Sequence, residues 1–268
     1  MNLGIFLELR SVDDIERKTR IACEAGYDGI QLYPPTLELG DADLSALVEA
    51  CETNNLAVPV ISAYCDLLKP EAAPMGFTLT QAEELIDWMQ PLGATNFVVW
   101  SGTLAPDLLG AHPDNRSDAA WKTIVANAKR LLDRLAPISG TLVIEPYYTH
   151  LAGDIEACLR LVNEVNHPAL KFVLDPPNMI PPERFVDQRD EMRKMVNALA
   201  PHIGLVHFKD ARLTSEGEYD FPGPGQGDLD YSVYMQKLKE IGYEGWGIVE
   251  HVCTEKMTSA LEHILVWI

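Results

Sequence analysis

The chain has 268 residues, 47% of them apolar, which is typical of one globular domain with a large core. It carries 21 lysines and arginines against 40 aspartates and glutamates, a formal net charge of −19. No run of basic residues exceeds two, so the sequence argues against nucleic acid or an anionic membrane surface as a partner.

The five cysteines are scattered and form no Cys-x-x-Cys pair, which argues against a disulfide framework or a structural zinc site. The first ten residues, MNLGIFLELR, lack the basic start of a signal peptide, and Glu8 interrupts their apolar run. No apolar run approaches the length of a membrane span. We therefore expect a cytoplasmic protein without a membrane segment.

Short apolar runs alternate with longer amphipathic ones along the chain. The sequence predicts strands at residues 3–7, 29–33, 57–64, 96–100, 141–145, 170–175, 203–208 and 246–250. It predicts helices at residues 41–55, from about Ser117 to Ala136, after a cap at Asp154, and from about Glu255 onward. Eight strands, each followed by a helix, indicate an α/β protein with a single (β/α)8 TIM barrel domain over residues 1–268. An open doubly wound sheet usually has a glycine-rich first turn, which LELRSVDD lacks.

Acidic or imidazole side chains stand at the ends of the last four predicted strands. Glu145 ends the fifth in LVIEPYYTH, and Asp175 ends the sixth in FVLDPPN. His207 lies near the end of the seventh in LVHFKDAR, and Glu250 ends the eighth in GIVEHV. Because the C-terminal strand ends of such a barrel share one rim, these side chains are expected to converge there.

Three carboxylates in one place repel each other unless a cation neutralises them. A single acidic residue at a strand end is often a loop cap or an ion-pair partner, but four ligands in succession favour a metal site. Two glutamates, one aspartate and one histidine suit Mn²⁺, Mg²⁺, Co²⁺ or Zn²⁺. We therefore predict a divalent metal ion, with Mn²⁺ as the first expectation.

The chain resembles the sugar phosphate isomerase/epimerase family of xylose isomerase-like barrels. The resemblance rests on the Glu of VIEPYYTH, the Asp of LDPPN, the HFKD block, the Glu of IVEH and the glycine-rich GPGQGDLDY. It spans nearly the whole chain. In the ketose 3-epimerases of that family the two ligand glutamates also transfer protons, which implies an acid/base pair formed by Glu145 and Glu250.

That role also follows from the chemistry. A metal that chelates a carbonyl and a neighbouring hydroxyl acidifies the C–H bond between them, giving a metal-stabilised enediolate once the proton leaves. One carboxylate removes the proton, and the second returns it on the opposite face. The leading expectation is thus a divalent-metal-dependent isomerase or epimerase of a ketose or related keto-sugar.

The chain departs from that family at two positions. Many relatives have a histidine three residues after the sixth-strand Asp and another two residues after the fifth-strand Glu. This chain has Asn178 and Tyr147 there. Because an amide and a phenol replace two imidazoles, a lyase remains the alternative to an isomerase. Such a lyase would expel a β-substituent from the substrate, and it would resemble inosose dehydratases or enzymes that cleave oxidised glycosides.

Further residues are predicted to contact the substrate: Asn178, Lys209, Arg212, His150, Tyr147, Glu8 and Trp100. All of them except Tyr147 have a structural alternative. Lys209 shares a strand face with His207 but can pair instead with Asp210 or a metal ligand. Arg212, suggested by the family resemblance, and His150, a candidate lid base, can be solvated. Asn178 can instead cap a loop, Glu8 can pair with Arg10, and Trp100 can pack at the barrel rim.

The glycines of PGPGQG can present backbone N–H groups to a phosphate, whereas the acidic balance favours a neutral sugar, polyol or glycoside. The expected partner is such a small molecule, with homo-oligomer formation left open. An enzyme resembling endonuclease IV would need more histidines than the seven present, together with basic loops. A non-catalytic binding subunit would not need the full ligand set.

Overall fold

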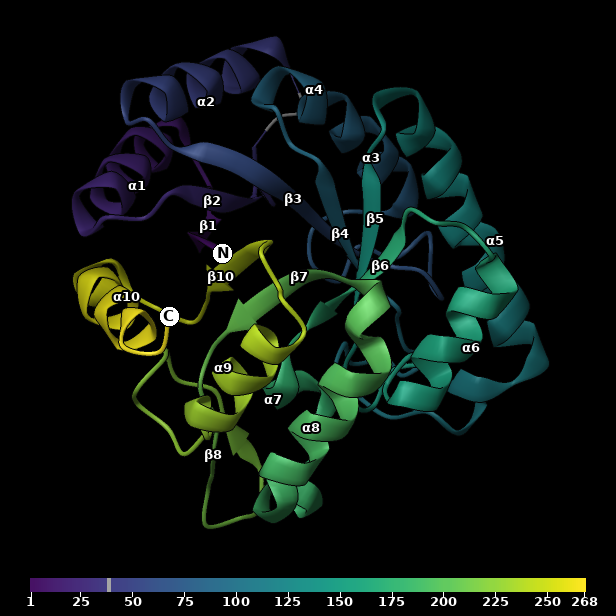
Figure 1. Ribbon diagram of the computed structural model, residues 1–268. Coiled ribbons are helices and arrows are strands. Elements are labelled where there is room, and N and C mark those ends of the chain that lie inside the picture. Colours follow the sequence, from purple (N-terminus) through teal and green to yellow (C-terminus); the bar gives the residue numbers. More distant parts are fainter. Residues whose placement is uncertain (38–39) are drawn as a thin grey trace.

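Eight parallel strands close into a barrel that helices surround, as the computed structural model of residues 1–37 and 40–268 shows (Figure 1). The strands are β1 (Asn2–Glu8), β2 (Gly29–Tyr33), β3 (Ala57–Asp66), β4 (Asn96–Trp100), β5 (Thr141–Glu145), β6 (Leu170–Leu174), β7 (Ile203–Phe208) and β10 (Trp246–Val249). Neighbours in sequence are neighbours in the barrel, and β10 pairs with β1 to close it. The predicted single-domain TIM barrel is confirmed.

The described residues form ten α-helices, most of which cover the outside of the barrel (Figure 1). They are α1 (Val12–Ala25), α2 (Asp41–Thr53), α3 (Leu79–Leu85), α4 (Met89–Leu92), α5 (Asp118–Leu135), α6 (Ile155–Val165), α7 (Pro176–Met179), α8 (Gln188–Leu199), α9 (Tyr231–Glu240) and α10 (Met257–Leu265). The Ser117 side chain accepts a hydrogen bond from the Ala120 N–H and caps α5. The predicted cap at Asp154 is confirmed, since its side chain accepts from the Ala157 N–H at the start of α6. No helix among the described residues is both long and apolar enough to cross a membrane.

The strands are apolar because both of their faces are covered. In β5, Leu142, Val143 and Ile144 are fully buried between the barrel interior and the surrounding helices. The same strand then places Glu145 at the rim, paired in register with Trp100 of β4. A buried apolar strand with a carboxylate at its C-terminal end is thus a rigid support for one rim side chain.

The connection between β7 and α9 is the most elaborate one. It contains a short antiparallel hairpin, β8 (Arg212–Leu213) and β9 (Tyr219–Asp220), followed by the glycine-rich segment. The Asp210 carboxylate accepts hydrogen bonds from the backbone N–H groups of Ala211, Gly225 and Leu229. A Cβ atom at Gly227 would lie 2.5 Å from Asp210 Oδ1, so this loop needs glycine to close around the carboxylate. The Gly225 N–H is therefore engaged by Asp210.

Candidate active site

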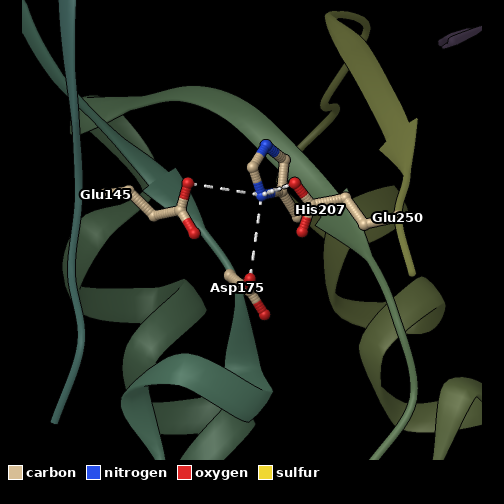
Figure 2. Close-up of side chains that lie close together, drawn as sticks. All are labelled: Glu145, Asp175, His207 and Glu250. Atoms are coloured by element: carbon tan, nitrogen blue, oxygen red, sulfur yellow. Dashed lines mark ion pairs between the residues drawn. The ribbon is translucent and has the colours of Figure 1, made fainter. Parts of the chain in front are cut away.

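Four side chains from consecutive barrel strands meet at the C-terminal rim (Figure 2). Glu145 ends β5, Asp175 directly follows β6, His207 lies in β7, and Glu250 directly follows β10. Each offers a ligand atom, and these atoms all lie within 4.8 Å of one another. The four residues are buried. The convergence that the strand-end pattern predicted is therefore present.

His207 is the centre of the cluster. Its Nδ1 lies 3.2 Å from Glu250 Oε1, 3.7 Å from Glu145 Oε2 and 3.7 Å from Asp175 Oδ2. Glu145 and Glu250 approach this nitrogen from different sides, with Asp175 below in the view of Figure 2. One imidazole nitrogen thus faces three carboxylates.

The other nitrogen of His207 is held by a residue from the opposite half of the barrel. His207 Nε2 lies 2.9 Å from Gln31 Oε1. The Gln31 amide group donates to Ser62 Oγ at 2.9 Å and to the Tyr64 phenol at 3.0 Å, so its oxygen is the atom left for His207. In its neutral form the imidazole therefore carries its proton on Nε2 and directs the Nδ1 lone pair at the carboxylates, as in a histidine that ligates a metal.

Several buried atoms of the cluster lack a hydrogen-bond partner within the described chain. They include Glu145 Oε2, Asp175 Oδ1 and His207 Nδ1. Leaving such groups unsatisfied costs about 1–3 kcal/mol each, and more for charged groups. Three carboxylates and one imidazole nitrogen form the donor set that Mn²⁺, Mg²⁺, Co²⁺ and Zn²⁺ accept, so the residues present fit a divalent cation.

The two glutamates have different electrostatic environments. Burial raises the pKa of Glu145 to about 8, and the positive charge of His207 offsets this only in part. Burial also acts to raise the pKa of Glu250, but the closer His207 outweighs it and lowers that pKa to about 2. For His207 itself, burial lowers the pKa, while the charges of Glu250 and Glu145 raise it to about 10.

Lys209 places a second positive charge against the cluster. Its Nζ lies 2.7 Å from Asp175 Oδ2 and 3.7 Å from Glu250 Oε2, and its side chain is buried. The sequence left two ion-pair partners open for Lys209, Asp210 or a carboxylate of the cluster. The structure shows the second, and the Asp210 carboxylate accepts hydrogen bonds from backbone N–H groups instead. Lys209 also lines the cavity above the cluster.

A cavity of about 770 Å³ opens at the rim beside the cluster. Its volume lies within the range of about 300–1,000 Å³ that is usual for small-molecule sites. Of the residues predicted to contact substrate, five line it: Glu8, Trp100, Tyr147, Asn178 and Lys209. Asn178 also donates from Nδ2 to Glu145 Oε1 at 2.7 Å, so it orients a glutamate of the cluster.

The other two predicted contact residues lie outside the cavity lining. Arg212 is exposed on the β8–β9 hairpin and pairs with Asp220 at 2.6 Å. His150 is buried, with Nε2 2.8 Å from the Leu108 carbonyl oxygen, and its ring packs against Trp100. Burial lowers its pKa to about 4. It is therefore neither exposed on a lid nor solvated.

Sequence reasoning missed Gln31 and Tyr64. Gln31 is a polar residue inside the buried strand GIQLY, which was a detectable signal. Tyr64 lies where the pairing of β3 with β4 shifts register, and its φ of 50° is in the left-handed region. That conformation is rare for a large residue and tends to occur at functional sites. It brings Tyr64 into the cavity wall next to Glu145.

Known proteins resemble this chain in sequence or in fold. The curated inosose dehydratase of Lacticaseibacillus casei is 22% identical over 151 residues, 50% of this chain and 48% of that protein. The chain thus matches about half the length of this relative. A D-allulose 3-epimerase from Methylomonas sp. superposes with a TM-score of 0.75 at 19% identity, over 100% of this chain and 98% of that chain. A xylose isomerase-like TIM barrel protein from Mycobacterium smegmatis, in complex with magnesium, superposes with a TM-score of 0.73 at 17% identity, over 99% and 95%.

At these identities the superpositions show a common fold alone. The sequence model of one family, described as the xylose isomerase-like TIM barrel, matches residues 19–267. That span includes the four residues of the cluster and all strands except β1. The chain belongs to the xylose isomerase-like TIM barrel family.

Proposed function

We propose that this protein is a divalent-metal-dependent isomerase or epimerase that acts on a ketose or a related keto-sugar. The observation that supports it most directly is the convergence of Glu145, Asp175, His207 and Glu250 beside a cavity of small-molecule size. The similarity in fold to a D-allulose 3-epimerase is consistent with this chemistry.

The four residues of the cluster would hold the cation, with His207 ligating through Nδ1. When bound, such a cation polarises sugar oxygens and makes the adjacent C–H bond more acidic. Gln31 fixes the His207 tautomer, and Asn178 fixes the Glu145 carboxylate. These contacts pre-orient the charged groups before substrate enters.

The two glutamates would transfer the proton. Glu145 and Glu250 reach the cluster from different strands, so a sugar carbon between them presents a different face to each. One carboxylate removes the proton from carbon, and the other delivers a proton to the opposite face. Lys209 would hold a sugar oxygen on which negative charge develops, because its ammonium group is buried and lines the cavity.

Metal analysis and solvent exchange test this proposal. We expect the purified protein to contain about one divalent ion, and chelation to abolish activity that Mn²⁺ restores. In deuterium oxide, a substrate ketose should exchange the hydrogen at the carbon next to its carbonyl. A protein that binds no divalent ion and exchanges no hydrogen with any keto-sugar would contradict the proposal.

A lyase is the second candidate, and the position of Tyr64 favours it. The phenol lies beside Glu145, and burial and the charge of that glutamate raise its pKa well above the usual value, so it stays protonated. A neutral donor next to a base can protonate a departing hydroxyl group after the base has removed the proton from carbon. Mass spectrometry of the product distinguishes the two reactions, because a dehydratase product is lighter by one water.

A further inference from the structure

The cavity is larger than one monosaccharide needs. Its volume of about 770 Å³ lies in the upper part of the range of about 300–1,000 Å³ in which drug-sized ligands bind. Glu145, Glu250, Lys209 and Asn178 lie along one part of its wall and offer the polar groups that a sugar ring requires. The remaining wall therefore has room for a second group of the ligand.

That remaining wall contains five aromatic side chains in contact with each other, which we call the aromatic wall: Phe6, Tyr33, Tyr64, Trp100 and Tyr147. Ring centroids are 5.8 Å apart for Phe6 and Tyr33, 5.4 Å for Tyr33 and Tyr64, and 5.3 Å for Tyr64 and Trp100. Tyr147 follows at 6.2 Å from Trp100. Four of these rings come from the first four strands of the barrel, and Tyr147 follows β5 two residues after Glu145.

Apolar residues extend the aromatic wall. Met75, Leu108, Leu109 and Val252 line the same cavity and are partly or largely exposed to solvent. Leu109, for example, has 41% of its surface exposed. A ligand group that covered these side chains would bury apolar area that water now contacts, which is the usual source of affinity for a flat apolar ring.

The cations of the cavity do not form a phosphate site. Arg10 pairs with Glu8, and Arg17 lies 2.8 Å from Asp14. Lys18 lies 3.4 Å from Asp14 and donates to the Glu8 carbonyl oxygen. Each of these cations already has a carboxylate partner, and the glycine-rich loop is closed around Asp210. A second apolar ring fits the remaining wall better than a phosphate does.

We infer that the aromatic wall is a subsite for an apolar ring joined to the sugar, so that the substrate is a glycoside of a keto-sugar with an aryl-type aglycone. This inference rests on the proposed function for the location of the sugar ring. It assigns the cluster to the sugar and the aromatic wall to the aglycone.

Equilibrium binding of the methyl and phenyl glycosides of one keto-glucose to the Mn²⁺-loaded protein tests this. The phenyl compound should bind at least about tenfold more tightly, because it buries one ring that the methyl compound lacks. Phe6→Ala should remove most of that preference, and Phe6→Leu, which keeps apolar volume for folding, should remove part of it. Val186→Ala is the matched control, since Val186 is 86% exposed and does not line the cavity.

Equal affinity for the two glycosides, or tighter binding of a keto-hexose phosphate than of the phenyl glycoside, would overturn the inference. So would a preference that both Phe6 variants leave unchanged. The binding ratio requires no turnover, so it remains interpretable if no sugar exchanges hydrogen with solvent. In that case the proposed function fails while the subsite stands.

Discussion

The half of the rim formed by β5, β6, β7 and β10 differs in chemistry from the half formed by β1 to β4. The first half directs Glu145, Asp175, His207 and Glu250 into the cluster. The second half contributes four aromatic rings to the cavity, Phe6, Tyr33, Tyr64 and Trp100, together with the ion-paired charges of Glu8, Arg10, Arg17 and Lys18. A single barrel thus places the candidate metal ligands on one side of the cavity and most of its aromatic rings on the other.

The two halves are nevertheless joined at two points. Gln31 of β2 holds the Nε2 atom of His207, and Tyr64 of β3 lies beside Glu145. The second half therefore also sets the orientation of the charged groups. Substitutions on each side of the cavity can measure how strongly each half of the rim affects metal binding and activity.

The largest effect is expected for the glutamates of the charged half. Glu250→Gln removes a metal ligand and one member of the proposed acid/base pair, so kcat/KM on a keto-sugar should fall by about 100- to 10,000-fold. Glu16→Gln is the matched control, because Glu16 is exposed on α1, which follows β1, and does not line the cavity. Steady-state kinetics should show near-native activity for the control. A comparable loss of kcat/KM in both variants would argue against a separation of roles between the two halves of the rim.

A smaller effect is expected where the halves meet. Gln31→Leu keeps the side-chain volume but removes the acceptor for His207 Nε2, so the imidazole is no longer held in its ligating orientation. Metal affinity, measured by competition with a chelator, should fall by about 10- to 100-fold. The control is Gln90→Leu, at an exposed position of α4 away from the cluster. Unchanged affinity in Gln31→Leu would mean that His207 needs no support from the second half.

Lys209 allows a test in which two effects have opposite signs. Lys209→Met removes a buried cation 2.7 Å from Asp175 Oδ2, so a divalent ion meets less repulsion and should bind up to about tenfold more tightly. Turnover should fall nonetheless, because the donor proposed for the sugar oxygen is lost. Lys239→Met, on the exposed face of α9, should change neither quantity. Weaker metal binding in Lys209→Met would show that the ammonium group organises the ligands instead.

The fold and the cluster were predictable because each leaves a local signal. A buried parallel strand is a short apolar run, and a carboxylate or imidazole at its end stands out against that run, as with Glu145 in TLVIE. The position of strand ends in a barrel then brings four such residues together without any knowledge of their contacts.

The second half of the rim was harder to predict because its signals are ambiguous. Trp100 at a strand end can be core packing or cavity wall, and only the tertiary structure separates the two. Tyr64 depends on a register shift within β3, which residue periodicity does not reveal. His150 and Arg212 show the converse: their residue types suggested contacts, but the loop path buries one and exposes the other.

The smallest expected effect comes from Tyr64→Phe, which removes one oxygen and keeps the ring of the aromatic wall. The lost phenol leaves one N–H of the Gln31 amide without its acceptor, while the bond to Ser62 remains. We expect the free energy of unfolding to fall by about 1–3 kcal/mol in denaturant titrations, because that donor stays buried. Metal affinity should fall less than in Gln31→Leu, and the preference for a phenyl glycoside should persist. If Tyr64→Phe abolished proton transfer while metal binding persisted, the phenol would be acting on the substrate, as the lyase candidate requires. In that case β3 would belong with the strands that supply reacting groups.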